Sequence, residues 1–189
     1  MTVPRRLKIA FIGTHGVGKT TLCYGLAARL KARDVVLEVV HEVARRCPLP
    51  INEGTGVGAQ SWILHTQIAE ELVASERYPV VLCDRSALDN YVYLLLARGP
   101  QAELETLVTS WMSGYQLLVF VPTSGALAAD GIRATDPEFQ RAVEARLRSE
   151  LRARSLAVLD LSDHARQAWL DVTERAVAER LDSPQLRFF

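Results

Sequence analysis

The chain has 189 residues, a length typical of one domain with its own hydrophobic core. Lysine plus arginine and aspartate plus glutamate each total 22, so no net positive charge favours general binding of nucleic acid. The longest apolar runs fall far short of the roughly 20 residues that span a bilayer, which excludes a transmembrane helix. Residues 7–12 are too short for a signal peptide, so we expect a single cytoplasmic domain, residues 1–189.

Short apolar runs alternate along the chain with longer stretches that have helical spacing of apolar residues. The runs predict strands at residues 7–12, 35–40, 78–83, 117–121 and 156–161. The longer stretches predict helices at residues 20–32, 59–76, 88–112, 137–154 and 165–181. This alternation predicts an α/β fold with an open parallel sheet covered by helices on both faces. Ligands bind such sheets at the carboxyl ends of the strands.

The first predicted strand leads into a glycine-rich loop, and an amphipathic helix follows it. Residues 13–20 match the phosphate-binding pattern G-x-x-x-x-G-K-[ST], and the flanking strand and helix favour this interpretation over an ordinary glycine turn. We expect backbone N–H groups to bind phosphates, Lys19 to reach the β and γ phosphates, and the Thr20 hydroxyl to bind Mg²⁺. The predicted nucleotide-binding residues are Gly13, Thr14, His15, Gly16, Val17, Gly18, Lys19, Thr20 and Thr21.

Charged residues follow the second and third predicted strands. Asp84 ends the third strand, where an aspartate holds Mg²⁺ in P-loop enzymes; its alternative role is a helix N-cap, which Ser86 could also fill. Glu42 follows the second strand, where a carboxylate can accept a proton from a substrate hydroxyl, although an exposed cap is the alternative. Arg85 can bind the transferring phosphoryl group or a substrate phosphate, or form a structural salt bridge.

A second group of residues is expected on the acceptor and lid sides. Residues 124–150 resemble a closing lid, and Arg133 within it is the expected stabiliser of the transferring phosphoryl group. Trp62 and Gln67 combine stacking and hydrogen bonding for a base or ring, although Trp62 is also compatible with core packing. Arg45, just beyond Glu42, completes the predicted acceptor contacts.

Several of these segments together resemble the AAA-domain family of small kinase-like P-loop proteins. That family is similar to the ribosylnicotinamide kinase domain and to nucleoside and thymidylate kinases, and the resemblance covers nearly the whole chain. It implies a three-layer α/β/α fold with a five-stranded parallel sheet, the Asp84 strand beside the P-loop strand. One departure is Val43 after Glu42, where deoxynucleoside kinases have proline. The segments that carry the resemblance are residues 13–21, 42–45, 67, 84–89 and 130–133.

The resemblance implies phosphoryl transfer from ATP, with Mg²⁺, to a nucleoside, nucleotide or related small molecule. ATP is the expected donor because the chain has no guanine-specifying N-K-x-D sequence. Two alternatives stay open. One is a P-loop ATPase or nucleotide-dependent switch that acts on a protein partner, since one fold hosts many functions. The other is a polynucleotide 5′-kinase, which the neutral net charge disfavours.

Overall fold

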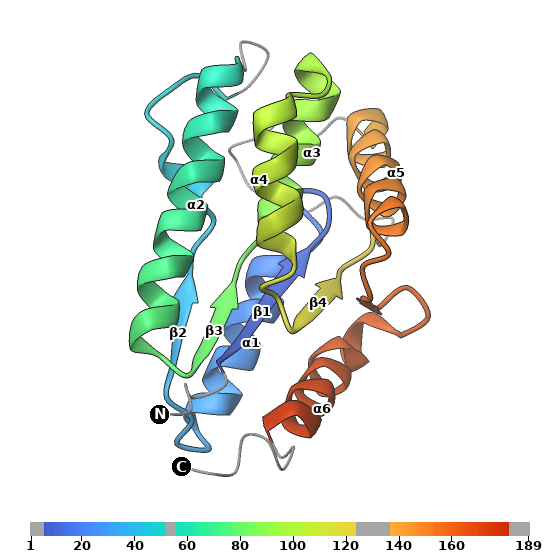
Figure 1. The fold of residues 1–189 in the computed structure, drawn as a ribbon. Helices are drawn as coiled ribbons and strands as arrows, with labels where there is room; N and C mark the ends of the chain where they lie inside the picture. Colours follow the sequence, from blue (N-terminus) through green and yellow to red (C-terminus); the bar gives the residue numbers. More distant parts are fainter. Residues whose placement is uncertain (1–5, 52–55, 124–136, 182–189) are drawn as a thin grey trace.

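The computed structural model describes residues 6–51, 56–123 and 137–181 and shows a three-layer α/β/α fold (Figure 1). Its central sheet contains β1 (Leu7–Ile12), β2 (Leu37–Val40), β3 (Val80–Cys83), β4 (Leu117–Phe120) and β5 (Leu159–Asp160). The strands lie in the order β2–β3–β1–β4–β5, and every neighbouring pair is parallel. The predicted fold class is confirmed, including the position of the Asp84 strand next to the P-loop strand.

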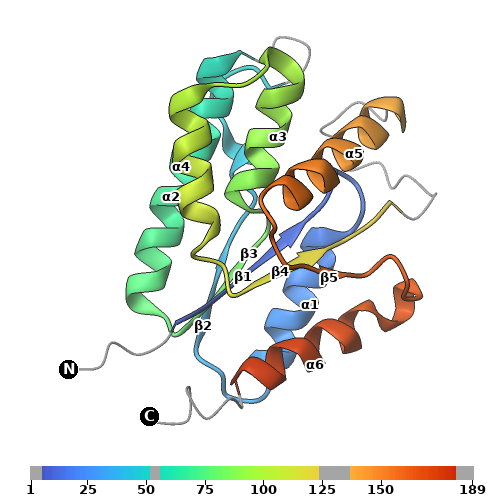
Figure 2. The same cartoon turned by 45° about the vertical axis from the view of Figure 1, so that its right-hand side comes forward.

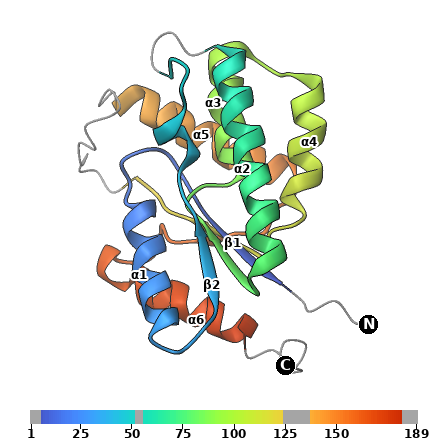
Figure 3. The same ribbon diagram turned by 90° about the vertical axis from the view of Figure 1, so that its left-hand side faces the viewer.

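Two helical layers cover the sheet, as Figures 2 and 3 show from two directions. One layer consists of α1 (Lys19–Lys31) and α6 (Trp169–Leu181). The other consists of α2 (Val57–Arg77), α3 (Ala87–Arg98), α4 (Ala102–Met112) and α5 (Pro137–Ala153). Short 3₁₀ helices follow β2, as η1 (Val43–Arg46), and precede α6, as η2 (Arg166–Ala168). Among the described residues, no helix is long and apolar enough to cross a membrane.

Alternate residues of each central strand enter different cores. In β1, Ile9 and Phe11 pack with α1 and α6, whereas Ala10 and Ile12 pack with the helices of the opposite layer. All four side chains are fully buried. A strand that is buried on both faces has a continuous apolar sequence, which is why the central strands were predictable.

Three predicted elements differ from the observed ones. The predicted helix 88–112 is two helices, α3 and α4, because Gly99 adopts a left-handed φ of 76° and Pro100 follows it. The predicted strand 156–161 contains only two paired residues, β5. The predicted helix 165–181 begins with the separate 3₁₀ turn η2.

Candidate active site

The glycine-rich loop joins the end of β1 to the first turn of α1. Its backbone has left-handed φ angles of 142° at Gly13, 71° at Gly16 and 97° at Gly18, a region that side chains with a Cβ rarely adopt. A Cβ at residue 13 would also lie 2.4 Å from the carbonyl oxygen of Val121. The loop conformation therefore depends on glycine, as the phosphate-binding pattern predicts.

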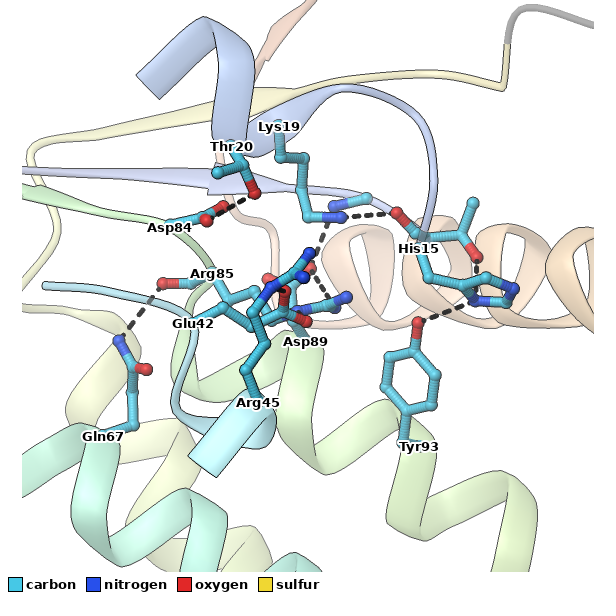
Figure 4. Close-up of polar contacts among 12 residues, drawn as sticks. His15, Lys19, Thr20, Glu42, Arg45, Gln67, Asp84, Arg85, Asp89 and Tyr93 are labelled. Carbon is cyan, nitrogen blue, oxygen red and sulfur yellow. Dashed lines mark hydrogen bonds and ion pairs between the residues drawn. The ribbon is translucent and has the colours of Figure 1, made fainter. Parts of the chain in front are cut away.

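Lys19 begins α1 and is buried beneath the loop. Its ammonium group donates a hydrogen bond to the Thr14 carbonyl oxygen, so the side chain reaches back to the first residues of the loop (Figure 4). Burial lowers the pKa of Lys19 to about 7, and the positive charge of Arg85 contributes to the same shift. Near neutral pH the ammonium group is therefore easily discharged, and an added anion would restore its charge.

This lowered pKa predicts that nucleotide affinity depends on pH. A bound phosphate favours the charged lysine, so the pKa of Lys19 rises on binding and the protein takes up a proton above pH 7. Between pH 7 and 8.5 we expect the affinity for Mg-ATP to fall by up to about tenfold per pH unit. Isothermal titration calorimetry in two buffers of different ionisation enthalpy measures the proton uptake. An uptake that persists in Lys19→Ala would assign it to another group.

Thr20 and Asp84 meet at the carboxyl edge of the sheet. The Thr20 hydroxyl donates to Asp84 Oδ2 at 2.6 Å, which joins the first turn of α1 to the end of β3 (Figure 4). Asp84 is 2% exposed, and its Oδ1 has no hydrogen-bond partner among the described residues. The helix N-cap is Ser86, whose hydroxyl accepts from Asp89 N. Asp84 is thus not consumed by capping, and one carboxylate oxygen remains available to a ligand.

Asp89 fixes the start of the glycine loop, a role that the sequence analysis did not assign to it. Its Oδ1 accepts from Gly13 N at 2.9 Å, and its Oδ2 accepts from Ser86 N and Ser86 Oγ at 3.0 and 2.6 Å. The contact from Ser86 N, together with the hydrogen bond from Asp89 N to Ser86 Oγ, forms a capping box, for which Ser86 and Asp89 have the correct spacing in sequence. The contact with Gly13 is tertiary and leaves no such local signal.

Glu42 lies opposite the loop and receives two guanidinium groups. Its Oε1 accepts from Arg85 Nε at 2.7 Å and its Oε2 accepts from Arg45 Nε at 2.8 Å. Glu42 and Arg85 are buried, whereas the Arg45 side chain is 41% exposed. Burial opposes the charge of Arg85, but Glu42 and Asp89 outweigh it and raise the pKa of Arg85 above its usual range. Arg85 therefore stays charged at all working pH values.

Arg85 has a backbone φ of 118°, a left-handed value that is rare for a residue with a side chain. This conformation follows the end of β3 and directs the guanidinium group toward Glu42, with Asp89 Oδ1 4.0 Å from Nη1. The ring of Tyr93 lies 5.3 Å from the guanidinium carbon. Backbone strain of this kind is concentrated at functional sites, and the role of Arg85 in phosphate binding stays a prediction.

The two predicted acceptor residues of α2 have different surroundings. Trp62 is partly buried and packs with the small apolar cluster that joins α2 to η1. Gln67 is fully buried, and its Nε2 donates to Glu71 Oε1 and to the Arg85 carbonyl oxygen. Trp62 is thus part of local packing, while Gln67 lies directly below the turn that carries Arg85 (Figure 4).

The loop also contacts α3 and α5 through His15. Gln140 Nε2 donates to the His15 carbonyl oxygen at 2.8 Å, and His15 Nδ1 lies 3.2 Å from the Tyr93 hydroxyl. The ring of Phe139 stacks on the imidazole, with centroids 6.1 Å apart. Helix α5, most of which lies within the predicted lid region 124–150, therefore touches the glycine loop directly. None of these contacts is local in sequence.

The predicted lid is described only in part. Arg133 and the rest of residues 124–136 lie outside the described residues, and the remainder of the predicted range, residues 137–150, forms most of α5. At the other end of the loop, the guanidinium group of Arg166 would lie 3.0 Å from a Cβ at Gly18. The 3₁₀ helix η2 before α6 thus reaches the start of α1, which the sequence analysis did not predict.

A strand, a glycine loop with these dihedral angles, and a buried lysine at the start of the next helix define a P-loop domain. A family model described as an AAA domain matches residues 8–168, so the chain belongs to that AAA-domain family. The resemblance drawn from the motifs is confirmed. Comparison with curated proteins gives no significant match.

Two solved structures share this fold. One is a NadR protein in complex with NR, with a TM-score of 0.69 and 20% sequence identity over 93% of this chain and 51% of that chain. The other is a NadR protein in complex with NAD and AMP-PNP, with a TM-score of 0.69 and 16% identity over 92% of this chain and 50% of that chain. The present chain spans about half the length of these structures.

Proposed function

We propose that this chain transfers a phosphoryl group from ATP to a small acceptor, such as a nucleoside, a nucleotide or a related metabolite. The observation that carries the proposal is the position of the Glu42–Arg85 pair directly beside the P-loop lysine and the Thr20–Asp84 contact. A P-loop alone is compatible with hydrolysis, but a carboxylate facing the phosphate site can also orient an acceptor hydroxyl.

The residues at the carboxyl edge suit a magnesium ion. Asp84 has an unpartnered oxygen within the described part of the chain, and the Thr20 hydroxyl lies beside it. Hydroxyl and carboxylate oxygens are the ligands that Mg²⁺ uses together with phosphates and water. We assign Thr20 and Asp84 to this ion, which would neutralise charge on the β and γ phosphates when bound.

Glu42 and Arg85 have complementary roles in this proposal. Arg85, held beside the loop, binds the transferring group through its remaining N–H groups; its Nη1 has no hydrogen-bond partner among the described residues. Glu42 accepts from both arginines, and its carboxylate can accept a proton from an acceptor hydroxyl. Arg133, which lies outside the described residues, remains our candidate for a further charge on the lid.

The acceptor class is supported by the comparison. A NadR protein with the same fold was solved with NR, and another with NAD and AMP-PNP. At this level of identity the likeness extends to the fold alone, so we propose only the general class of acceptor. Arg45 and Gln67 lie on the Glu42 side of the loop and are our acceptor-binding candidates. We retain Trp62 as a second-choice contact because its ring is partly buried in local packing.

ADP release with Mg-ATP tests the proposal against a panel of nucleosides, nicotinamide riboside and nucleoside monophosphates, with and without Mg²⁺. We expect one acceptor class to stimulate turnover by at least about tenfold and Lys19→Ala to abolish it. Detection of the phosphorylated product identifies the acceptor. Slow turnover that no acceptor stimulates, but that Lys19→Ala removes, would instead identify an ATPase or switch.

A further inference from the structure

A fully buried carboxylate, Glu71, lies on α2 one helical turn beyond Gln67 and outside the phosphate site. Its oxygens accept hydrogen bonds from Lys8 Nζ at 2.9 Å, Trp111 Nε1 at 2.7 Å, the Tyr115 hydroxyl at 2.6 Å and Gln67 Nε2 at 2.8 Å. Lys8 supplies the opposite charge, and its ammonium group lies over both aromatic rings, 4.2 and 4.3 Å from their centroids. Each of these contacts to the Glu71 carboxylate comes from a hydrogen-bond donor.

The direction of the hydrogen bond from Tyr115 is fixed by its second contact. Its hydroxyl accepts from Ala87 N at 3.1 Å, so its own proton goes to Glu71. Burial raises the pKa of Tyr115 well above its usual value, which keeps that proton in place. Glu71 Oε1 therefore acts only as an acceptor. The Gln67 atom that faces it must be the donor, the amide nitrogen Nε2.

The requirement for a donor toward Glu71 determines the orientation of the Gln67 amide. Nε2 lies 2.8 Å from Glu71 Oε1 and 3.4 Å from the Arg85 carbonyl oxygen. Both partners are acceptors, so both contacts select the nitrogen and the opposite amide orientation is excluded. The amide oxygen Oε1 is buried and has no hydrogen-bond partner among the described residues. A buried carbonyl of this kind is unfavourable until a donor pairs with it.

The Gln67 side chain lies beside the turn of Arg85 and thus near the Glu42–Arg85 pair (Figure 4). Ile63, one turn before Gln67 on α2, packs against Val43 and Ala44, the residues of η1 next to Glu42. Gln67 continues the same face of the helix and reaches the turn of Arg85, whose guanidinium group binds Glu42 (Figure 4). A ligand bound beside Glu42 therefore meets this face of α2.

We infer that Glu71 is a positioning residue that turns the Gln67 oxygen toward the acceptor, and that the acceptor presents an N–H or O–H group to this oxygen. The inference rests on the proposed function, because it assigns the acceptor's chemistry at that same site. The site should therefore bind acceptors that carry a hydrogen-bond donor more tightly than analogues in which that donor is methylated, ionised or absent. Discrimination arises because the analogue leaves the Gln67 oxygen buried and unpaired.

Paired ligands test this directly in the full chain loaded with Mg-AMP-PNP. The pairs are uridine with 3-methyluridine, adenosine with N6,N6-dimethyladenosine, nicotinamide riboside with nicotinic acid riboside, and uridine with its 2′- and 3′-deoxy forms. We expect at least one donor-bearing member to bind about tenfold more tightly than its partner, measured as Kd by calorimetry. If no pair shows such a difference, including the case in which no member binds, the inference is overturned.

Two variants separate orientation from stability. Glu71→Gln lets residue 71 donate to the Gln67 oxygen, so the amide can reverse and the preference should fall to about threefold or less. Trp111→Phe also removes one hydrogen bond from Glu71, but it leaves the carboxylate and the Gln67 contact intact, so the preference should persist. A preference unchanged in Glu71→Gln would show that Glu71 does not position Gln67.

Nitrogen-15 NMR supplies a readout that needs no ligand. In the wild type and in Trp111→Phe, the side-chain NH₂ protons of Gln67 should exchange slowly, because both contacts of Nε2 are buried. In Glu71→Gln they should exchange at least about tenfold faster; equal protection would overturn the positioning role. Ligand discrimination without any ADP release would refute phosphoryl transfer but not this inference, whereas ADP release without discrimination would refute the inference alone.

Discussion

Gly13→Ala is expected to lose nucleotide binding and to destabilise the fold by at least about 3 kcal/mol. The new methyl group would lie 2.4 Å from the backbone oxygen of Val121, at a φ of 142° that alanine does not tolerate. Relief of this clash requires the loop to move away from β4, and the hydrogen bond from Gly13 N to Asp89 is then lost. We expect the affinity for AMP-PNP to fall at least about a hundredfold.

Gly58→Ala is the matched control, because a Cβ at this position in the first turn of α2 meets nothing within 4 Å. A helical glycine replaced by alanine gains up to about 1 kcal/mol, so this variant should be neutral or slightly more stable. Urea unfolding and calorimetric binding of AMP-PNP measure both effects. Equal behaviour of the two variants would show that the loop adapts to a side chain at residue 13.

The parts of the fold that could be predicted are those in which the local pattern of apolar residues matches their burial in the structure. The central strands are continuous apolar runs because both faces are covered, and the P-loop has a fixed spacing that backbone geometry imposes. The strand β5 was overestimated because only two of its residues pair with β4, although the apolar run is longer. The break between α3 and α4 was missed even though Gly99 and Pro100 are strong local signals.

In the candidate site, only residues that belong to a local sequence motif could be predicted. Lys19, Thr20 and Asp84 follow from motif spacing; the structure places Lys19 against the Thr14 carbonyl oxygen and Thr20 against Asp84, and their roles stay predictions. The contacts of Asp89 with Gly13, and of Gln140 with His15, join residues 76 and 125 positions apart in the chain. Such pairs have no signature in a single sequence, because only the folded sheet brings them together.

The buried Glu42–Arg85 pair determines how Glu42 must be tested. Glu42→Ala removes the carboxylate and also leaves the 2%-exposed Arg85 without its closest counter-ion. Removing one partner of a buried pair costs about 3–5 kcal/mol, so lost activity in this variant would not distinguish catalysis from folding. Glu42→Gln avoids the difficulty, because its amide oxygen still accepts from Arg85 while its affinity for a proton is lost.

Glu42→Gln is therefore expected to reduce acceptor-stimulated ADP release by about 10²- to 10⁴-fold, with a loss of unfolding free energy of no more than about 2 kcal/mol. The contact with the half-exposed Arg45 adds little to that loss, because exposed ion pairs contribute at most about 1 kcal/mol. Glu70→Gln, which removes an ion pair of α2 with Arg46, should leave both quantities nearly unchanged. If Glu42→Gln transfers phosphate at the wild-type rate, Glu42 serves to hold Arg85 in place, and the acceptor hydroxyl is oriented by another group.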